Sequence, residues 1–204
     1  MELLIVRHAE SEPNVAGIIN SDPERPSPLT GRGRRQAGEL GRTLVSQQID
    51  LCVTSELERS IATADIVIAG RLIERRVMPE LNDARAGDFE GASAAEHRRW
   101  LAVNGLTAPN PGGGESQLDA LRRYVRVFWS LASLRDERVI IVAHGMPIAW
   151  LRSAREIAAT GGTDDPQADF PNPGVDFAGT PDRFRRDELM EATELLERFA
   201  DQAA

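Results

Sequence analysis

Residues 139–145, VIIVAHG, give the clearest indication of the fold class of this chain. Its run of branched apolar residues is typical of a strand that is buried on both faces, as strands of parallel sheets are. A second run, LLIV at residues 3–6, has the same character and is followed at once by Arg7 and His8. Both runs predict core strands of a parallel sheet.

Segments with helical spacing alternate with the strand-like segments. Thr30 is suited to cap a helix that runs to about Gln47. Alternating strands and helices predict an α/β fold, specifically a three-layer α/β/α sandwich around a mostly parallel central sheet. No repeat or second core is visible, so residues 1–204 are predicted to form a single domain. Further strands are predicted at residues 50–54 and 72–78, helices at 57–68, 93–103, 118–132, from 146 onward and at 189–199, a long loop at 12–33, and a loop with one weak edge strand at 160–182.

The composition excludes several classes of protein. The chain has 204 residues with a formal net charge of −8, which disfavours nucleic acid and anionic membranes as partners. Cys52 is the single cysteine, so no disulfide forms within the chain. No apolar run reaches the ~18 residues of a membrane span, and the charged opening residues do not resemble a signal peptide. We therefore expect a cytoplasmic protein.

All 24 basic residues are arginine. This excludes Schiff-base chemistry and the lysine of a phosphate-binding P-loop. A bound phosphate would have to be held by arginine, histidine, hydroxyl groups or backbone amides.

Chemically active residues follow the predicted strands. Ligands of open parallel sheets bind beyond the carboxyl ends of the strands. Two of the three histidines in the chain, His8 and His144, occupy such positions, beside Arg7 and Gly145 respectively. Arg59 follows the strand at 50–54 by one turn of helix. This pattern favours a functional site at one edge of the sheet.

The chemistry that fits these residues is phosphoryl transfer to a histidine. A neutral imidazole is a good nucleophile near pH 7. Guanidinium groups favour the neutral imidazole and bind phosphoryl oxygens through paired hydrogen bonds. The leaving alkoxide then needs a proton from a carboxylic acid. These groups suffice without metal or cofactor, so neither is expected.

The chain resembles the histidine phosphatase superfamily, also called the phosphoglycerate mutase-like family. The resemblance rests on six segments in the expected order, with Ala9 where the family usually has glycine. The segments are LLIVRHAESEPN (3–14), SPLTGRGRRQA (27–37), VTSELERSIATA (53–64), ELNDARAGDFEG (80–91), GGGES (112–116) and VIIVAHGMPI (139–148).

This resemblance implies roles for the residues at the strand ends. His8 would be the nucleophile that becomes phosphorylated, with the phosphoryl group surrounded by Arg7, Arg59 and His144. Gly145 would let the backbone approach the ligand closely.

Two polar residues of the first segment are further candidates. Asn14 matches a residue that contacts phosphate or substrate in related enzymes. Ser11 either contacts the phosphate as well or only holds the loop.

The identity of the proton donor stays open. The family usually has a glutamate four residues before the glycine of the acid loop, and counting back from Gly87 gives Asp83. Aspartate is one methylene shorter, and a misplacement of about 1 Å can cost on the order of 10²-fold in rate. Glu80 is the alternative acid. A third interpretation is that the acid is impaired and turnover is slow.

The resemblance implies a metal-independent phosphomonoesterase that acts on a small phosphorylated metabolite through a phosphohistidine intermediate. The alternatives are a phosphoglycerate mutase and a phosphate-binding relative with weak or no turnover. Mutases usually carry a long, lysine-containing insertion after the acid loop, and this chain has only a short stretch between Gly91 and His144 and no lysine. Relatives often form dimers, so a homodimer is one expectation. The acidic segment 160–182 is a hypothetical lid or rim of the site.

Overall fold

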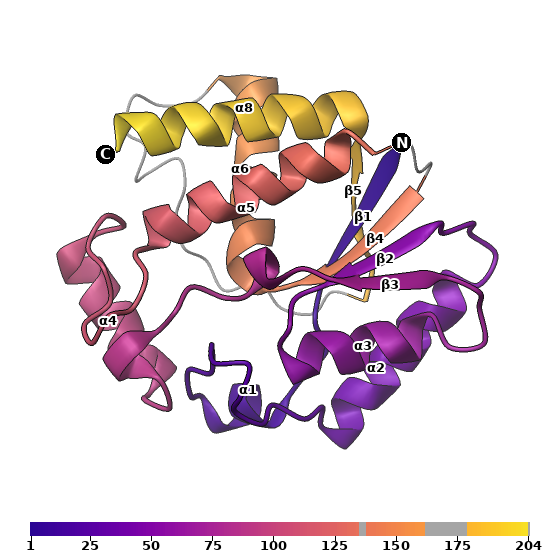
Figure 1. The fold of residues 1–204 in the computed structure, drawn as a ribbon, viewed down its shortest axis with the longest axis horizontal. Helices are drawn as coiled ribbons and strands as arrows, with labels where there is room; N and C mark the ends of the chain where they lie inside the picture. The colour runs from indigo at the N-terminus through magenta and orange to yellow at the C-terminus, as the bar shows by residue number, and fades with distance from the viewer. Residues whose placement is uncertain (135–137, 162–178, 204) are drawn as a thin grey trace.

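The computed structural model describes residues 1–134, 138–161 and 179–203 (Figure 1). Within them, a five-stranded sheet has the order β3-β2-β4-β1-β5. Neighbouring strands run parallel except for β5, which is antiparallel to β1. The prediction of a mostly parallel sheet is therefore confirmed. The strands are β1 (Glu2–Arg7), β2 (Leu51–Thr54), β3 (Glu74–Val77), β4 (Arg138–Ala143) and β5 (Asp182–Arg185).

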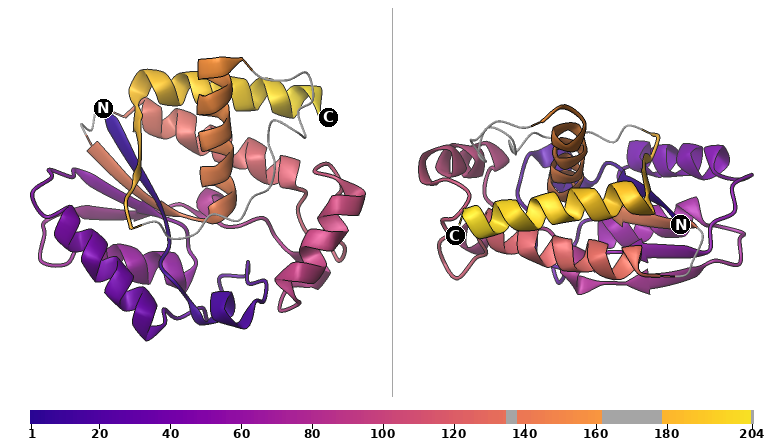
Figure 2. Two further views of the ribbon diagram at one scale, coloured as in Figure 1. Left: turned by 180° about the vertical axis from the view of Figure 1, so that it is seen from behind. Right: turned by 90° about the horizontal axis from the view of Figure 1, so that it is seen from above.

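Helices cover both faces of the sheet, which confirms the three-layer arrangement (Figures 1 and 2). One face packs against α2 and α3, and the other packs against α5, α6 and α8. Two further helices, α1 and α4, lie beyond the carboxyl ends of the strands (Figure 1). The helices are α1 (Glu12–Ala16), α2 (Gly31–Thr43), α3 (Glu58–Val67), α4 (Ala94–Asn104), α5 (Gln117–Ala132), α6 (Gly145–Thr160) and α8 (Arg186–Gln202), with short 3-10 turns at Pro79–Leu81 and Gly87–Phe89.

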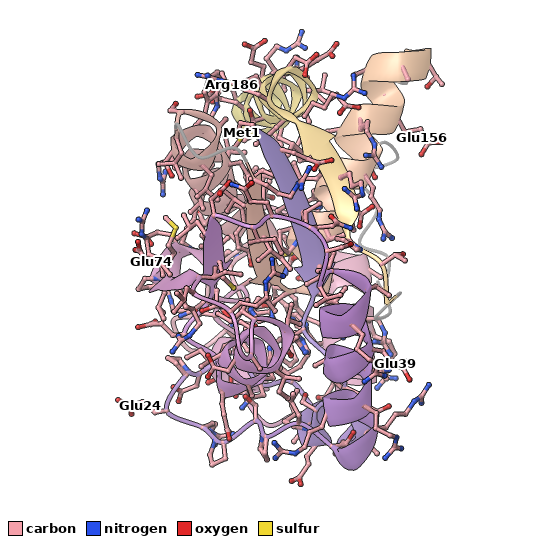
Figure 3. The ribbon with its side chains drawn as sticks, turned by 90° about the vertical axis from the view of Figure 1, so that its right-hand side faces the viewer. Met1, Glu24, Glu39, Glu74, Glu156 and Arg186 are labelled. Carbon is pink, nitrogen blue, oxygen red and sulfur yellow. The ribbon has the colours of Figure 1, made fainter. Side chains whose placement is uncertain are left out.

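Strand β1 shows why its sequence is apolar throughout. Successive side chains of a strand point to opposite faces. Leu3 and Ile5 pack with α5, α6 and α8, whereas Leu4 and Val6 pack with α2 and α3. Helices cover both faces, so neither set can be polar. Charged side chains lie on the outer surfaces of the helices instead, as Glu39 does on α2 (Figure 3).

The structure refines several predicted boundaries. The Thr30 side chain accepts a hydrogen bond from the Gly33 amide at 2.9 Å, which confirms the predicted cap of α2. The helix ends at Thr43 rather than near Gln47. The 12–33 segment is not wholly a loop, because α1 forms there with proline in its first turn, where no amide donor is needed.

The last predicted loop is only partly described. The edge strand β5 runs from Asp182 to Arg185, so it shares only Asp182 with the range 160–182 in which the sequence predicts a weak edge strand. The proposed acidic lid falls almost entirely on 162–178, outside the described residues. Among the residues that are described, no helix is long and apolar enough to cross a membrane.

Candidate active site

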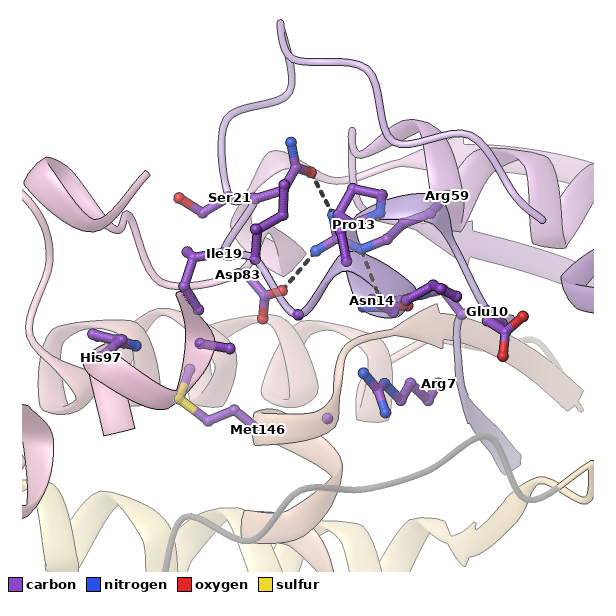
Figure 4. A pocket seen from close by; sticks show the side chains of 18 of the residues that line it. Arg7, Glu10, Pro13, Asn14, Ile19, Ser21, Arg59, Asp83, His97 and Met146 are labelled. Carbon is purple, nitrogen blue, oxygen red and sulfur yellow. Dashed lines mark hydrogen bonds and ion pairs between the residues drawn. The ribbon is translucent and has the colours of Figure 1, made fainter. Parts of the chain in front are cut away.

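A cavity of about 1110 Å³ opens at the carboxyl ends of the strands (Figure 4). Its walls come from the end of β1, the segment around α1, the start of α3, the loop before α4, and the first turns of α4 and α6. Segments far apart in the sequence meet here because the carboxyl ends of parallel strands lie at the same edge of the sheet.

His8 follows β1 directly and is only 3% exposed. Its Nδ1 lies 2.8 Å from the carbonyl oxygen of Ala9. A carbonyl can only accept, so Nδ1 must carry the proton, and the lone pair of the neutral ring is on Nε2. Arg59 donates to that same Nε2 from its Nε atom at 3.0 Å. The backbone of the loop thus selects the tautomer in which Nε2 is the nucleophilic nitrogen.

Arg59 is buried and joins three parts of the site. Besides His8, its guanidinium donates to Oδ1 of Asn20 at 2.7 Å and to Oδ2 of Asp83 at 2.8 Å (Figure 4). The Thr63 hydroxyl, one turn along α3, accepts from the Ala9 amide and donates to the Arg59 carbonyl. Burial lowers the pKa of Arg59, and the Asp83 carboxylate opposes this shift. The guanidinium is therefore fixed next to His8 as a charged group.

His144 lies between β4 and α6 and is 1% exposed. Its Nε2 is 2.9 Å from the Ser55 hydroxyl, and its Nδ1 is 3.3 Å from Oδ2 of Asp83. The rings of His8 and His144 have their centres 5.2 Å apart. The two histidines that the sequence singled out are therefore in the same site.

Both site histidines are held in the neutral form. Burial lowers the pKa of His8 well below its usual value, and the charge of Arg59 lowers it further. The same two causes, in the same order, lower the pKa of His144. Neither ring carries a charge near pH 7, so the positive charge of the site comes from arginine.

Asp83 lines the cavity on a loop whose backbone is held at the preceding residue. Its side chain is 30% exposed and forms an ion pair with Arg59. The preceding residue, Asn82, accepts from the amide of Glu56 through its side chain at 2.8 Å. Its carbonyl accepts from the buried Tyr124 hydroxyl, also at 2.8 Å. These bonds fix the backbone from which the Asp83 carboxylate projects.

Glu80, the alternative acid, lies outside the cavity. It is exposed and is not among the lining residues. After Asp83 the loop turns through Gly87, whose φ is 59°, into the 3-10 turn Gly87–Phe89. A Cβ there would be 1.9 Å from the carbonyl oxygen of Pro111. Only glycine fits this close approach, which packs the loop after Asp83 against the segment around Pro111.

The remaining predicted site residues divide into two groups. Arg7, Asn14 and Gly145 line the cavity. Ser11 does not, because it is fully buried and its hydroxyl donates to Oδ1 of Asn14 at 2.9 Å. This geometry favours the alternative that Ser11 holds the loop, and its contact with phosphate stays a prediction. This bond leaves the amide nitrogen of Asn14 as a donor.

Sequence reasoning missed Asn20 and Glu10, both of which line the cavity. Asn20 accepts from Arg59, and the Glu10 carboxylate accepts from the Thr30 hydroxyl at 2.7 Å and pairs with Arg32. Neither follows a strand directly, so the rule about strand ends could not find them.

Metal ligands do not cluster in the described parts of the chain. Within these ranges, no group of three or more His, Cys, Asp or Glu side chains could hold a metal ion.

The fold and the charges of the site suit a class of protein that binds phosphoryl groups, since two neutral histidines and two arginines meet at the edge of a parallel sheet. The sequence pattern of the histidine phosphatase superfamily (branch 1) matches residues 3–162. The chain belongs to this superfamily.

Similar proteins include phosphatases and a mutase. The chain is 39% identical over 153 residues to the adenosylcobalamin/alpha-ribazole phosphatase of Escherichia coli, covering 71% of this chain and 73% of that protein. It is 33% identical to a 2,3-bisphosphoglycerate-dependent phosphoglycerate mutase of Cytophaga hutchinsonii, covering 70% and 71%. Bacillus stearothermophilus YhfR has a similar structure, with a TM-score of 0.71, 25% identity, and coverage of 89% and 94%. The chain is a phosphatase of this superfamily, as its phosphatase relatives indicate.

Proposed function

We propose that the chain is a metal-independent phosphomonoesterase that transfers the phosphoryl group of a small metabolite to Nε2 of His8. One observation carries the proposal: the Ala9 carbonyl holds the proton on Nδ1, so the lone pair on Nε2 faces Arg59. Arg59 and Arg7 supply the positive charge that a divalent cation would otherwise provide to the phosphoryl oxygens.

Substrate binding replaces the hydrogen bonds that Arg59 donates to His8 and Asp83 with hydrogen bonds to the phosphoryl group. Phosphoryl oxygens take over the donors that now reach His8 and Asp83, so Nε2 becomes available to attack. Gly145 contributes the first amide of α6, whose N-terminus favours an anion. Asn14 adds its amide nitrogen at the mouth of the cavity.

The reaction then runs in two steps. In the first, Nε2 of His8 forms a bond to phosphorus while the bond from phosphorus to the ester oxygen breaks, and Asp83 donates its proton to that oxygen. In the second, water attacks phosphorus, the bond to Nε2 breaks, and Asp83 takes a proton from the water. The products are an alcohol and inorganic phosphate. His144 stays neutral and donates to a phosphoryl oxygen.

Asp83 is placed to reach the ester oxygen. In the free site its carboxylate is paired with Arg59, and a bound phosphoryl group would compete for that arginine and release the carboxyl group toward the leaving oxygen. Relatives that are named phosphatases act on small phosphorylated metabolites, and this supports the same substrate class here.

The decisive experiment compares wild type, His8→Ala and Arg99→Ala with p-nitrophenyl phosphate and EDTA. Arg99 is exposed on α4 and does not line the cavity, so it is the matched control. We expect turnover by wild type and Arg99→Ala, none by His8→Ala, and an acid-labile phosphoryl label on His8. Turnover that EDTA abolishes, or that His8→Ala retains, would contradict the proposal. Phosphate transfer to monophosphoglycerate without release of inorganic phosphate would identify a mutase.

Two further expectations stay predictions. A cytoplasmic location is expected from the sequence, and cell fractionation would test it. A homodimer is expected from relatives, and light scattering during size-exclusion chromatography would measure the mass directly.

A further inference from the structure

His97 lines the same cavity but takes no part in the chemistry proposed above. In Figure 4 it lies on the opposite side of the cavity from Arg7, with Asp83 between them. A phosphoryl group held by Arg7 and Arg59 would direct its ester oxygen toward the proton donor, Asp83. The alcohol part of the substrate would then extend toward His97.

The ring of His97 is held in one orientation. It packs at 4.9 Å between ring centres against Phe89, and it stacks on Trp100 with an angle of 10° between the planes. Its Nε2 lies 2.9 Å from Oδ1 of Asn110. These contacts with two aromatic rings, together with the bond at Nε2, fix the ring and with it the position of Nδ1.

The orientation of Asn110 determines where the His97 proton lies. Asn110 is 3% exposed, and its Nδ2 donates to the carbonyl of Arg85 at 3.0 Å. A carbonyl can only accept, so the nitrogen of the amide must face Arg85 and its oxygen must face His97. Nε2 of His97 therefore donates, and in the neutral ring Nδ1 is left as an acceptor. Within the described ranges, no protein group bonds that Nδ1.

We infer that His97 is a specificity-determining residue whose Nδ1 accepts a hydrogen bond from a hydroxyl group of the substrate's alcohol part, so that hydroxylated phosphomonoesters such as sugar phosphates are the preferred substrates. This rests on the proposed function. A cavity of about 1110 Å³ has room for such an organic part beside the phosphoryl group. An acceptor at this position takes a donor such as a hydroxyl group. Arg32 and Arg98 also line the cavity and would bind an anionic group, so the experiment compares the two kinds of substrate.

The test measures kcat/KM for p-nitrophenyl phosphate, which has no hydroxyl on its leaving group, and for ribose 5-phosphate, glucose 6-phosphate and glycerol 3-phosphate. The variants are His97→Phe, which keeps the stacking and removes both nitrogens, and His97→Gln, which keeps an acceptor. Arg99→Ala is the control on the same helix. Thermal melting shows whether each variant is folded.

We expect His97→Phe to lower the ratio of sugar phosphate to p-nitrophenyl phosphate activity by about fivefold to tenfold for at least one sugar phosphate, as loss of one neutral hydrogen bond predicts. His97→Gln should restore part of the ratio, and Arg99→Ala should leave it unchanged. A ratio within about twofold of wild type in a folded His97→Phe would overturn the inference, because one lost hydrogen bond is worth more than that.

Other outcomes separate this inference from the proposed function. Wild type that hydrolyses p-nitrophenyl phosphate through His8 but none of the sugar phosphates would overturn the inference alone. A preference for 3-phosphoglycerate that is lost in Arg98→Ala would also overturn the inference, because the cavity would then recognise the carboxylate of the substrate through Arg98 rather than a hydroxyl group through His97. Wild type inactive toward every ester would overturn the proposed function and this inference with it.

Discussion

Replacing Asp83 by Asn tests the assignment of the proton donor. Asparagine has nearly the same shape and keeps an oxygen that can accept from Arg59, whose Nη2 now lies 2.8 Å from the Asp83 carboxylate. It cannot supply a proton. The substitution therefore separates the acidic role of this side chain from its role as a hydrogen-bond partner of the arginine.

The magnitude depends on the leaving group. General acid catalysis contributes about 10²–10⁴-fold, or about 3–5 kcal/mol in the barrier. The alkoxide that leaves from an alkyl phosphate such as glycerol 3-phosphate is strongly basic and must be protonated as it leaves. Its kcat/KM should therefore fall by that whole factor in Asp83→Asn. The nitrophenolate ion leaves readily without a proton, so p-nitrophenyl phosphate should lose less than about tenfold.

The matched control is Glu80→Gln, because Glu80 is exposed and outside the cavity. Its kcat/KM should stay within about twofold of wild type for both esters, as is usual for an exposed side chain that touches no substrate. Steady-state kinetics across pH 4–8 measure all three proteins. Equal losses for both esters in Asp83→Asn would refute the acid role and leave only the pairing with Arg59. A large loss confined to Glu80→Gln would refute the placement of the acid altogether.

Two predictions concern stability. Burial lowers the pKa of His8 and His144 well below 6.5 in the folded chain, so only the unfolded chain takes up protons on them as the pH falls below about 6.5. The free energy of unfolding should therefore be constant above about pH 6.5. Below that pH it should fall by up to about 1.4 kcal/mol per pH unit for each histidine, down to the pKa that this histidine has in the folded chain. Urea unfolding at pH 7, 6 and 5 measures this, and an equally steep fall in His8→Asn would contradict it. Gly87→Ala should lower the free energy of unfolding by about 2–4 kcal/mol, from the left-handed φ and the contact with Pro111 together. Gly113 has a φ of 80° and no atom within 4 Å of the position that a Cβ would take. Its change to Ala should therefore cost only about 1–2 kcal/mol, so equal losses would show that the contact at Gly87 is unimportant.

Much of the fold follows from the sequence because strands that are covered by helices on both faces must be apolar along their whole length, which makes them recognisable as apolar runs. The runs at 3–6 and 139–142 became β1 and β4, which pair with each other along their length. Short elements were less predictable. Helix α1 has only five residues and is stabilised by a local cap rather than by an apolar stripe, so it leaves no periodic signal.

The site was predictable where it follows the strands. Arg7, His8 and His144 were found from their positions at strand ends, and Arg59 from its place one turn into the next helix. Asn20 was not found, because a polar residue in a loop with prolines resembles any other until the chain folds it against Arg59.

The layered α/β architecture, and the edge of the sheet at which the site residues lie, follow from the sequence alone. Local patterns of apolar and polar residues identify the buried strands and their carboxyl ends. The packing of distant segments determines three further features: Asp83 and not Glu80 lines the cavity, Ser11 is buried behind Asn14, and the proton of His8 is on Nδ1. Those outcomes depend on which side of a loop faces the cavity and on contacts such as that between Gly87 and Pro111, and such contacts exist only once distant segments have packed together.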